Sequence, residues 1–124
     1  MSELRGFRDL IVYQKSYRLA LEIFEITKTF PKEEKYSLID QIRRSSRSVP
    51  TNIAESWAKR IYPKVFVNKL SDALGEESET EVWLDFSNDN QYIDNQKHRN
   101  LIQDYDEVRK MLIAMMNHPE KFCK

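Results

Sequence analysis

Three arginines and three serines lie close together in the segment from Gln41 to Ser56. Arg43 and Arg47 are four positions apart, and Arg44 follows Arg43 directly. A guanidinium group can donate two parallel hydrogen bonds to a phosphate or a carboxylate, so a cluster of arginines suits these anions better than a cluster of lysines does. The segment therefore predicts an anion-binding surface.

More cations follow this segment. Residues 41–69 contain seven Lys or Arg and one acid, Glu55. The predicted contacts with the phosphates of RNA or DNA are Arg43, Arg44, Arg47, Lys59, Arg60 and Lys64. The alternative is that these side chains pair with carboxylates in contacts between subunits and have no role in nucleic-acid binding.

Acidic residues dominate the next part of the chain, with eight Asp or Glu and no Lys or Arg between Leu70 and Gln96. Glu77, Glu81 and Asp85 recur every four residues, so they would share one face of a helix and could bind Mg²⁺. A face of this kind is more often solvated or paired with basic groups. We therefore predict no metal site.

The sequence offers little for catalysis. His98 and His118 belong to no local catalytic motif, and Gly6 and Gly75 are the only glycines, which excludes a glycine-rich phosphate loop. Helical di-iron proteins carry Glu-x-x-His motifs, and this sequence has none. We predict no enzyme activity and no cofactor.

Composition indicates the class of protein. The 124 residues carry 20 Lys or Arg and 20 Asp or Glu, but the net charge is +6 over residues 1–69 and −6 over residues 70–124. This asymmetry indicates a partner or self-association. A length of 124 residues predicts one domain, residues 1–124. The single cysteine, Cys123, predicts a cytoplasmic protein. The lack of a long apolar run or leader predicts no membrane contact.

Apolar residues recur at helical spacing in four segments, and no segment alternates as a strand does. We expect helices over about residues 7–29, 33–60, 63–88 and 95–117. Their expected apolar positions are Leu10, Tyr13, Tyr17, Ala20 and Phe24, widened by Ile11 and Leu21; Ile39, Ile42, Ser46, Val49 and Ile53; Val65, Phe66, Leu70, Ala73, Leu74, Val82, Trp83 and Phe86; and Leu101, Tyr105, Val108, Leu112 and Met115. Short connections between long helices favour an all-α, antiparallel up-down-up-down four-helix bundle.

Pro50 lies inside the second expected helix, where it removes one intrahelical hydrogen bond. We expect a kink there, with a nearby serine hydroxyl or water taking up the freed carbonyl. Beyond the proline, Asn52 and Glu55 flank Ile53 and could hydrogen-bond to another helix or subunit, or be solvated. Apolar residues outside the main seam that offer surface for self-association are Ile11, Tyr36 and Trp57.

The stretch QIRRSSRSVPTNIAES resembles the Q-x-R-R-A-x-x-S-[IV]-P-x-N-I-A-E-G signature of the four-helix bundle proteins encoded in intervening sequences of bacterial 23S ribosomal RNA genes. The opening from Phe7 to Tyr13 and the stretches FPKEEKYSL and SETEVWLDF…YI also match, so the resemblance covers about residues 7–115. Matching positions of the signature are Arg43, Arg44, Pro50, Asn52, Ile53, Ala54 and Glu55. Ser56 stands where the family has Gly, and GEESETE is unusually acidic.

The resemblance also implies partners. Members of this family look like up-down four-helix bundles that assemble into a pentameric ring, which implies a homo-oligomer, a pentamer, for this chain. One branch, the accessory protein of diversity-generating retroelements, binds nucleic acid and a reverse transcriptase through a basic surface, which implies RNA or DNA and a protein partner. That branch is strongly basic, whereas this chain is neutral.

Overall fold

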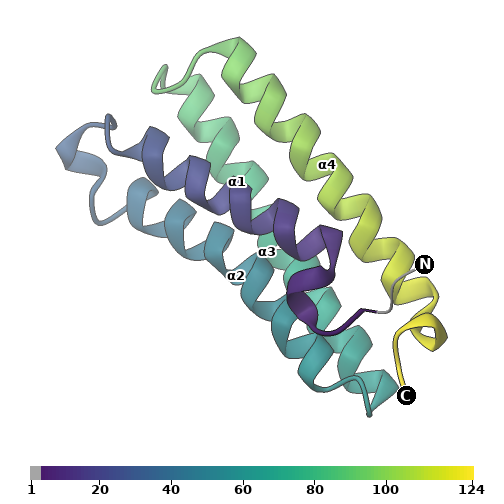
Figure 1. Cartoon of the computed structure of the whole chain (residues 1–124). Coiled ribbons are helices and arrows are strands. Elements are labelled where there is room, and N and C mark those ends of the chain that lie inside the picture. Colours follow the sequence, from purple (N-terminus) through teal and green to yellow (C-terminus); the bar gives the residue numbers. More distant parts are fainter. Residues whose placement is uncertain (1–3) are drawn as a thin grey trace.

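The computed structural model describes residues 4–124, and every regular element in that range is helical. Four α-helices form the body of the protein (Figure 1): α1 Ile11–Thr27, α2 Leu38–Ala58, α3 Pro63–Asp89 and α4 Asn95–Asn117. Three short 3-10 turns accompany them: η1 Phe7–Asp9, η2 Lys32–Glu34 and η3 Pro119–Lys121. The all-α prediction is confirmed for these residues, while residues 1–3 of the expected domain lie outside the described range. No helix within residues 4–124 has both the length and the apolar character needed to cross a membrane.

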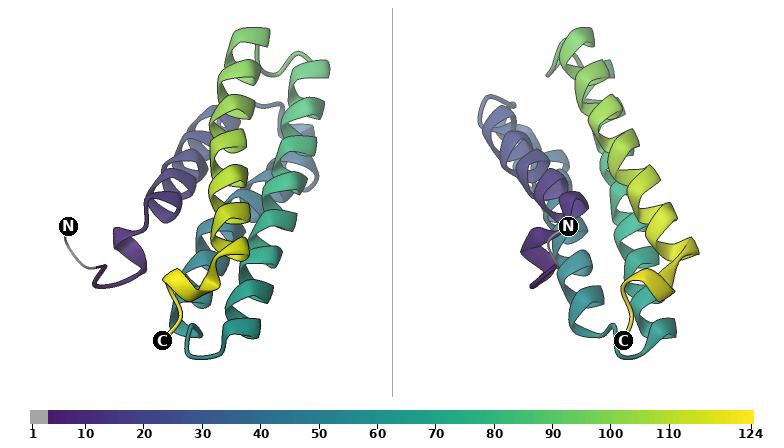
Figure 2. Two further views of the ribbon diagram at one scale, coloured as in Figure 1. Left: turned by 90° about the vertical axis from the view of Figure 1, so that its right-hand side faces the viewer. Right: turned by 45° about the vertical axis from the view of Figure 1, so that its right-hand side comes forward.

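Each helix packs against the next one along the chain, and α4 also packs against α1. Figure 2 shows this arrangement from two further sides. The α1–α2 and α3–α4 connections meet at one end, where the Tyr92 hydroxyl donates a hydrogen bond to Glu34 Oε2 at 2.9 Å and the Tyr92 ring lies 5.2 Å from that of Phe30. The α2–α3 connection and the C-terminus lie together at the other end.

Glu34 prepares the start of α2, which begins at Leu38 rather than near residue 33. Its carboxylate accepts hydrogen bonds from Ser37 Oγ at 2.5 Å and from Tyr92, and these bonds lower the pKa of Glu34. The Leu38 amide also donates to Glu34 Oε1 at 3.5 Å. A negative charge is favourable at this position because the first amides of a helix carry partial positive charge.

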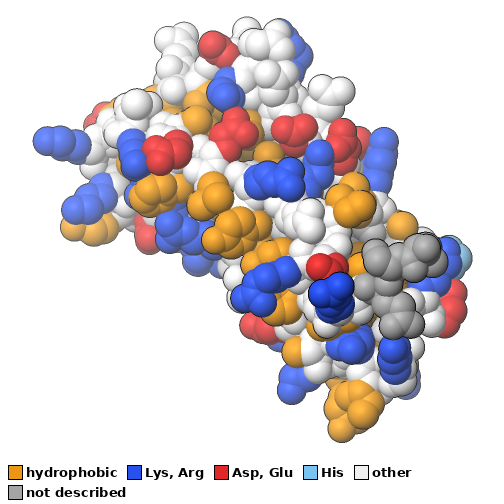
Figure 3. All heavy atoms as spheres, viewed as in Figure 1, with side chains coloured by type: hydrophobic (Ala, Val, Ile, Leu, Met, Phe, Trp, Pro, Cys, Tyr) orange, Lys and Arg blue, Asp and Glu red, His pale blue; other side chains and the backbone are white. Residues whose placement is uncertain are grey.

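The core follows the predicted seams in some helices and departs from them in others. All five expected positions of α4 are buried, and four of the five in α2 are fully buried: Ile42, Ser46, Val49 and Ile53. Of the positions expected in the first helix, only Leu10 and Ala20 are buried. The other buried residues of α1 are Val12, Ser16, Leu19, Ile23 and Thr27. Tyr17 and Leu21 are 48% and 53% exposed. Because α1 has apolar residues on two faces, spacing alone could not say which face enters the core. Figure 3 shows hydrophobic side chains on the surface along α1 and at the end where α2 joins α3.

Two small hydroxyl side chains, Ser45 and Thr80, meet between α2 and α3, and both are fully buried. Ser46 and Ser56 of α2 are also fully buried, and each donates to a carbonyl oxygen of α2 itself. Thr80 Oγ1 lies 2.8 Å from both Ser45 Oγ and the Glu76 carbonyl oxygen. Small residues let two helix backbones approach closely, and these hydroxyls find hydrogen-bond partners inside the interface.

The structure corrects the prediction of a solvated or paired acidic face on α3 at one position: Glu77 is fully buried, whereas Glu81 is half-buried and Asp85 is exposed. Within residues 4–124, neither oxygen of its carboxyl group has a hydrogen-bond partner, and the buried hydroxyl of Tyr105 on α4 has none either. Burial raises the pKa of Glu77 to about 9; the Glu81 carboxylate adds to this rise and Arg109 opposes it. Burial also raises the pKa of Tyr105. Glu77 is therefore protonated and uncharged at neutral pH.

We expect Glu77→Gln to stabilise the protein by an amount that grows with pH. Below the ordinary carboxyl pKa of 4.5, Glu77 is protonated in both the folded and the unfolded chain. Between that value and about 9, only the unfolded chain releases the proton, so the free energy of unfolding falls by up to about 1.4 kcal/mol per pH unit. The substitution removes this loss.

Urea unfolding at several pH values measures this effect. Glu33→Gln, at an exposed position, is the control and should follow the pH dependence of the wild type. Equal pH dependence of the two variants would contradict the assignment of a buried, protonated Glu77.

Candidate functional site

Pro50 lies in the middle of α2, and the helix continues on both sides of it. Around it, Ser48, Thr51 and Asn52 each donate a side-chain hydrogen bond to the carbonyl oxygen four residues earlier, at 2.8–2.9 Å. Side chains that bond to the helix backbone in this way often accompany bends in helices. The polar residues of the segment thus bond mainly to α2 itself.

Arg43 binds α1 of the same chain. Its Nε donates to Thr27 Oγ1 at 2.8 Å and its Nη2 donates to the Phe24 carbonyl oxygen at 3.3 Å. The guanidinium also lies over the Phe24 ring, 4.4 Å from its centroid. Since the last carbonyls of a helix lack helical partners, Arg43 stabilises the C-terminal end of α1.

Arg44 joins α2 to the acidic α3. Its Nη1 and Nη2 donate to the two carboxylate oxygens of Glu76 at 3.0 and 3.2 Å, and Nη2 also donates to Glu79. These carboxylates raise the pKa of Arg44. Hydrogen bonds from Trp83 and Arg44 outweigh the burial of Glu79 and lower the pKa of that carboxyl. Basic α2 and acidic α3 therefore pair within one chain.

The remaining predicted cations differ in exposure. Arg60 is half-buried: it donates to the Trp57 carbonyl oxygen at 2.9 Å and stacks on the Trp57 ring, 4.1 Å from its centroid. Arg47 is exposed, with its guanidinium 5.3 Å from the centroid of Phe24. Lys59 and Lys64 are exposed at the α2–α3 connection. The structure thus engages Arg43, Arg44 and Arg60 within the chain and leaves Arg47, Lys59 and Lys64 on the surface.

The motif residues after Pro50 have different surroundings. Ile53 and Trp57 are buried, so Trp57 lies in the core rather than on the surface that the sequence suggested. Glu55 is exposed and forms an ion pair with Lys69 Nζ of α3 at 2.9 Å. Ala54 is half-buried on the side of α2 that meets α1.

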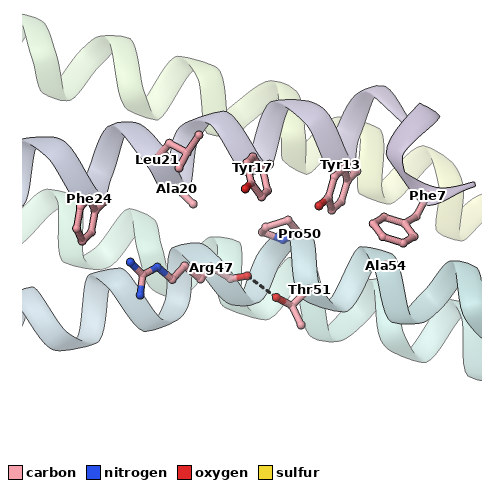
Figure 4. A pocket seen from close by; sticks show the side chains of 10 residues that line it. All are labelled: Phe7, Tyr13, Tyr17, Ala20, Leu21, Phe24, Arg47, Pro50, Thr51 and Ala54. Carbon is pink, nitrogen blue, oxygen red and sulfur yellow. Dashed lines mark hydrogen bonds between the residues drawn. The ribbon is translucent and has the colours of Figure 1, made fainter.

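An apolar groove of about 540 Å³ runs between α1 and α2 (Figure 4). Its lining residues are Phe7, Tyr13, Tyr17, Ala20, Leu21 and Phe24 on one side and Arg47, Pro50, Thr51 and Ala54 on the other. Aromatic rings follow one another along the first side, with centroids 4.9 Å apart for Phe7 and Tyr13 and 5.7 Å apart for Tyr13 and Tyr17. The groove is therefore an apolar surface that also contains a cation, Arg47, beside Phe24.

Sequence reasoning missed this groove because it assigned Tyr13, Tyr17 and Phe24 to the core. A signal was present: α1 has a second apolar stripe that includes Leu19 and Ile23. If only one face of a helix packs into the core, the second apolar stripe remains at the surface. The segments over residues 7–13 and 41–56 both carry the family resemblance, and both contribute residues to this groove.

No group of three or more His, Cys, Asp or Glu side chains within residues 4–124 is arranged to hold a metal ion. His98 Nε2 lies 2.8 Å from Asp85 Oδ1, and His118 Nδ1 lies 3.2 Å from Glu120 Oε1. These are pairs at or near the surface. What the site supplies chemically is apolar contact and positive charge.

Comparisons with known proteins relate this arrangement to one family. The family model described as 23S rRNA-intervening sequence protein matches residues 8–114. Among solved structures, the chain is similar to a protein of unknown function from the S23 ribosomal protein family of Bacteroides thetaiotaomicron. The two are 31% identical with a TM-score of 0.77, over 86% of this chain and 96% of that chain. No curated protein sequence matches the chain.

We expect Arg44→Gln to lower the free energy of unfolding by about 0.5–1.5 kcal/mol, because its ion pairs are partly exposed and screened by solvent. The loss should shrink in high salt. Because the pKa of Glu79 is lowered, the contribution of the pair is present above the ordinary carboxyl pKa and disappears as the pH falls through the lowered value. Urea unfolding at low and high salt measures the difference. Arg47→Gln is the control, and equal losses in the two variants would refute the role of Arg44.

Proposed function

The chain belongs to the family of 23S rRNA-intervening sequence proteins, and on that premise we propose that it acts without catalysis, as a homo-oligomer that binds the backbone of RNA or DNA. The resemblance implies a pentameric ring. The proposal includes a cytoplasmic location, in keeping with a single cysteine. The competing proposal is an assembly protein whose surface cations serve only the contacts between subunits.

The observation that carries the proposal of self-assembly is the exposed apolar groove between α1 and α2. Tyr17 and Leu21 on its wall keep about half of their surface in water. Removing apolar surface from water stabilises a contact by about 25 cal/mol of free energy for each Å² that is buried. A contiguous apolar surface of this kind is typical of a contact with another protein.

A second copy of the chain offers a matching surface on α3. Val82 and Phe86 lie one turn apart and are 49% and 50% exposed. Asp85 and Asp89 are exposed beside them. An apolar ridge with flanking acids fits an apolar groove that contains Arg47. Contact between two unlike surfaces is heterologous, and such contacts close into rings when the rotation between subunits allows it.

The proposed architecture is an up-down-up-down bundle with a bend in α2 at Pro50. Pro50 is buried and lines the groove together with Tyr17 and Leu21. A bend at this position would set the angle between the two walls of the groove. We therefore assign the proline a role in shaping the subunit contact.

Leu21→Glu should convert the oligomer into a monomer of 14.9 kDa, because the contact would bury an unpaired carboxylate. Light scattering after gel filtration at micromolar concentration measures the mass. Ile113→Glu is the control, since Ile113 is an exposed aliphatic residue of α4 that does not line the groove, and it should leave the mass unchanged. A wild-type protein that is monomeric at both low and high salt would overturn the proposal of self-assembly.

Surface cations support the proposed binding of nucleic acid. Arg43, Arg44 and Arg60 hold contacts within the chain, and Arg47 lies in the groove that we assign to the subunit contact. The contacts we propose with phosphates are therefore Lys59 and Lys64. Few cations on a neutral protein favour weak binding that tolerates many sequences and depends on salt. Several copies in one ring would strengthen it through avidity.

We expect the wild type to bind a labelled structured RNA, with log K falling against log salt at a slope of about −1.4 to −1.8 per protomer if two phosphates are neutralised. Lys59→Glu combined with Lys64→Glu should weaken binding and keep the oligomer. Fluorescence anisotropy and gel filtration of the same samples measure both properties. If the wild type fails to bind at low salt, the assembly protein without a nucleic-acid role becomes the better account.

A further inference from the structure

The end of the molecule at the α2–α3 connection has a distinct composition. Here we define the basic tip as residues 59–64 together with residues 118–124. These two segments contain five Lys or Arg and one acid, Glu120. His118 pairs with Glu120, and Arg60 is held on Trp57. The exposed cations of the basic tip are therefore lysines: Lys59, Lys64, Lys121 and Lys124.

One segment lies at the start of α3 and the other follows α4, and the fold brings them together. The Phe122 ring stacks with that of Phe66 in the first turns of α3, with centroids 6.0 Å apart. Lys64 and Pro119 line one shallow hollow. The C-terminus lies beside the α2–α3 connection in every view (Figures 1 and 2).

Two bulky side chains project among these lysines. Ile61 is 64% exposed and Tyr62 is 60% exposed. The backbone beneath Tyr62 is fixed, because its amide donates to the Lys59 carbonyl oxygen at 2.9 Å and its carbonyl accepts from the Phe66 amide at 2.9 Å. Hydrophobic side chains with Lys and Arg around them are visible at this end in Figure 3. The Tyr62 ring is therefore exposed on an ordered turn that has lysines before and after it, Lys59 and Lys64.

We propose that the basic tip binds unpaired nucleotides of RNA or DNA, with Tyr62 stacking on a base and the surrounding lysines contacting phosphates. This inference rests on the proposed nucleic-acid function and specifies its partner as a single strand. A basic surface that also carries aromatic side chains is the combination that single-strand binding proteins use, and stacking tolerates any base. A membrane surface is the weaker fit, because binding to lipid scales with the buried apolar area and the tip offers little beyond Ile61 and Tyr62.

The test compares a short labelled single strand with the duplex of the same sequence by fluorescence anisotropy, using the full chain. We expect tighter binding to the single strand. Tyr62→Ala should weaken this binding about fivefold or more, which corresponds to the loss of one stacked base. Tyr62→Phe keeps the ring and should keep the affinity.

Tyr36→Ala is the matched control. Tyr36 is 84% exposed, lies in the α1–α2 connection at the opposite end, and has both bases and acids nearby in the chain, Lys32 and Lys35 with Glu33 and Glu34. This substitution should not change binding, and circular dichroism should show unchanged helicity in all three variants.

The outcomes separate this inference from the proposed function. Equal binding of single strand and duplex, with no effect of Tyr62→Ala, would overturn the inference and leave backbone binding in place. Absence of binding to both nucleic acids at low salt would overturn the inference and the proposed nucleic-acid function together. Sedimentation with vesicles of phosphatidylglycerol, without binding to the single strand, would overturn the inference in favour of a lipid surface.

Discussion

The packing of a basic helix against an acidic helix of the same chain is the contact on which the rest of this structure depends. Arg44 bonds to Glu76 and Glu79, and Glu55 pairs with Lys69, so charges of both signs cross between α2 and α3. The small buried residues Ser45 and Thr80 between the two helices allow this close approach. The opposite charges of the two halves of the chain are thus partly neutralised inside one subunit. Exposed cations that take no part in these pairs include Arg47 at the groove and the lysines of the basic tip.

The sequence was most informative where a helix has a single apolar face. In α4 each expected core residue is buried, because most other residues of that helix are polar and one orientation hides the apolar stripe. In α1 two faces are apolar, and the tyrosines at spacings of three and four formed the more regular pattern. In the structure, the aliphatic face with Leu19 and Ile23 packs into the core instead. An aromatic face that stays on the surface is where the candidate groove lies.

The roles of the charged residues depended on partners that are distant in the chain. Arg44 and its carboxylates are separated by 32 and 35 residues, so local spacing could identify the arginine cluster but not its neighbours. Glu77 shows the same limit, because its spacing from Glu81 and Asp85 describes one helix and says nothing about α4 packing over it. The lysines of the basic tip also come from two separate segments, which meet where Phe122 packs on Phe66 and Pro119 lies beside Lys64.

The packing of each helix on its neighbour in the chain has a consequence for how the protein folds. Three of the four helix contacts join consecutive helices, and only the contact of α1 with α4 spans most of the sequence. Chains dominated by such local contacts fold quickly, in microseconds to milliseconds for helical bundles. The α2–α3 hairpin needs only a short loop to close and contains the ion pairs of Arg44, so it can form before the ends of the chain meet. On this view the contact of α1 with α4 is the last of the helix contacts to form, because it alone requires the two ends of the chain to meet.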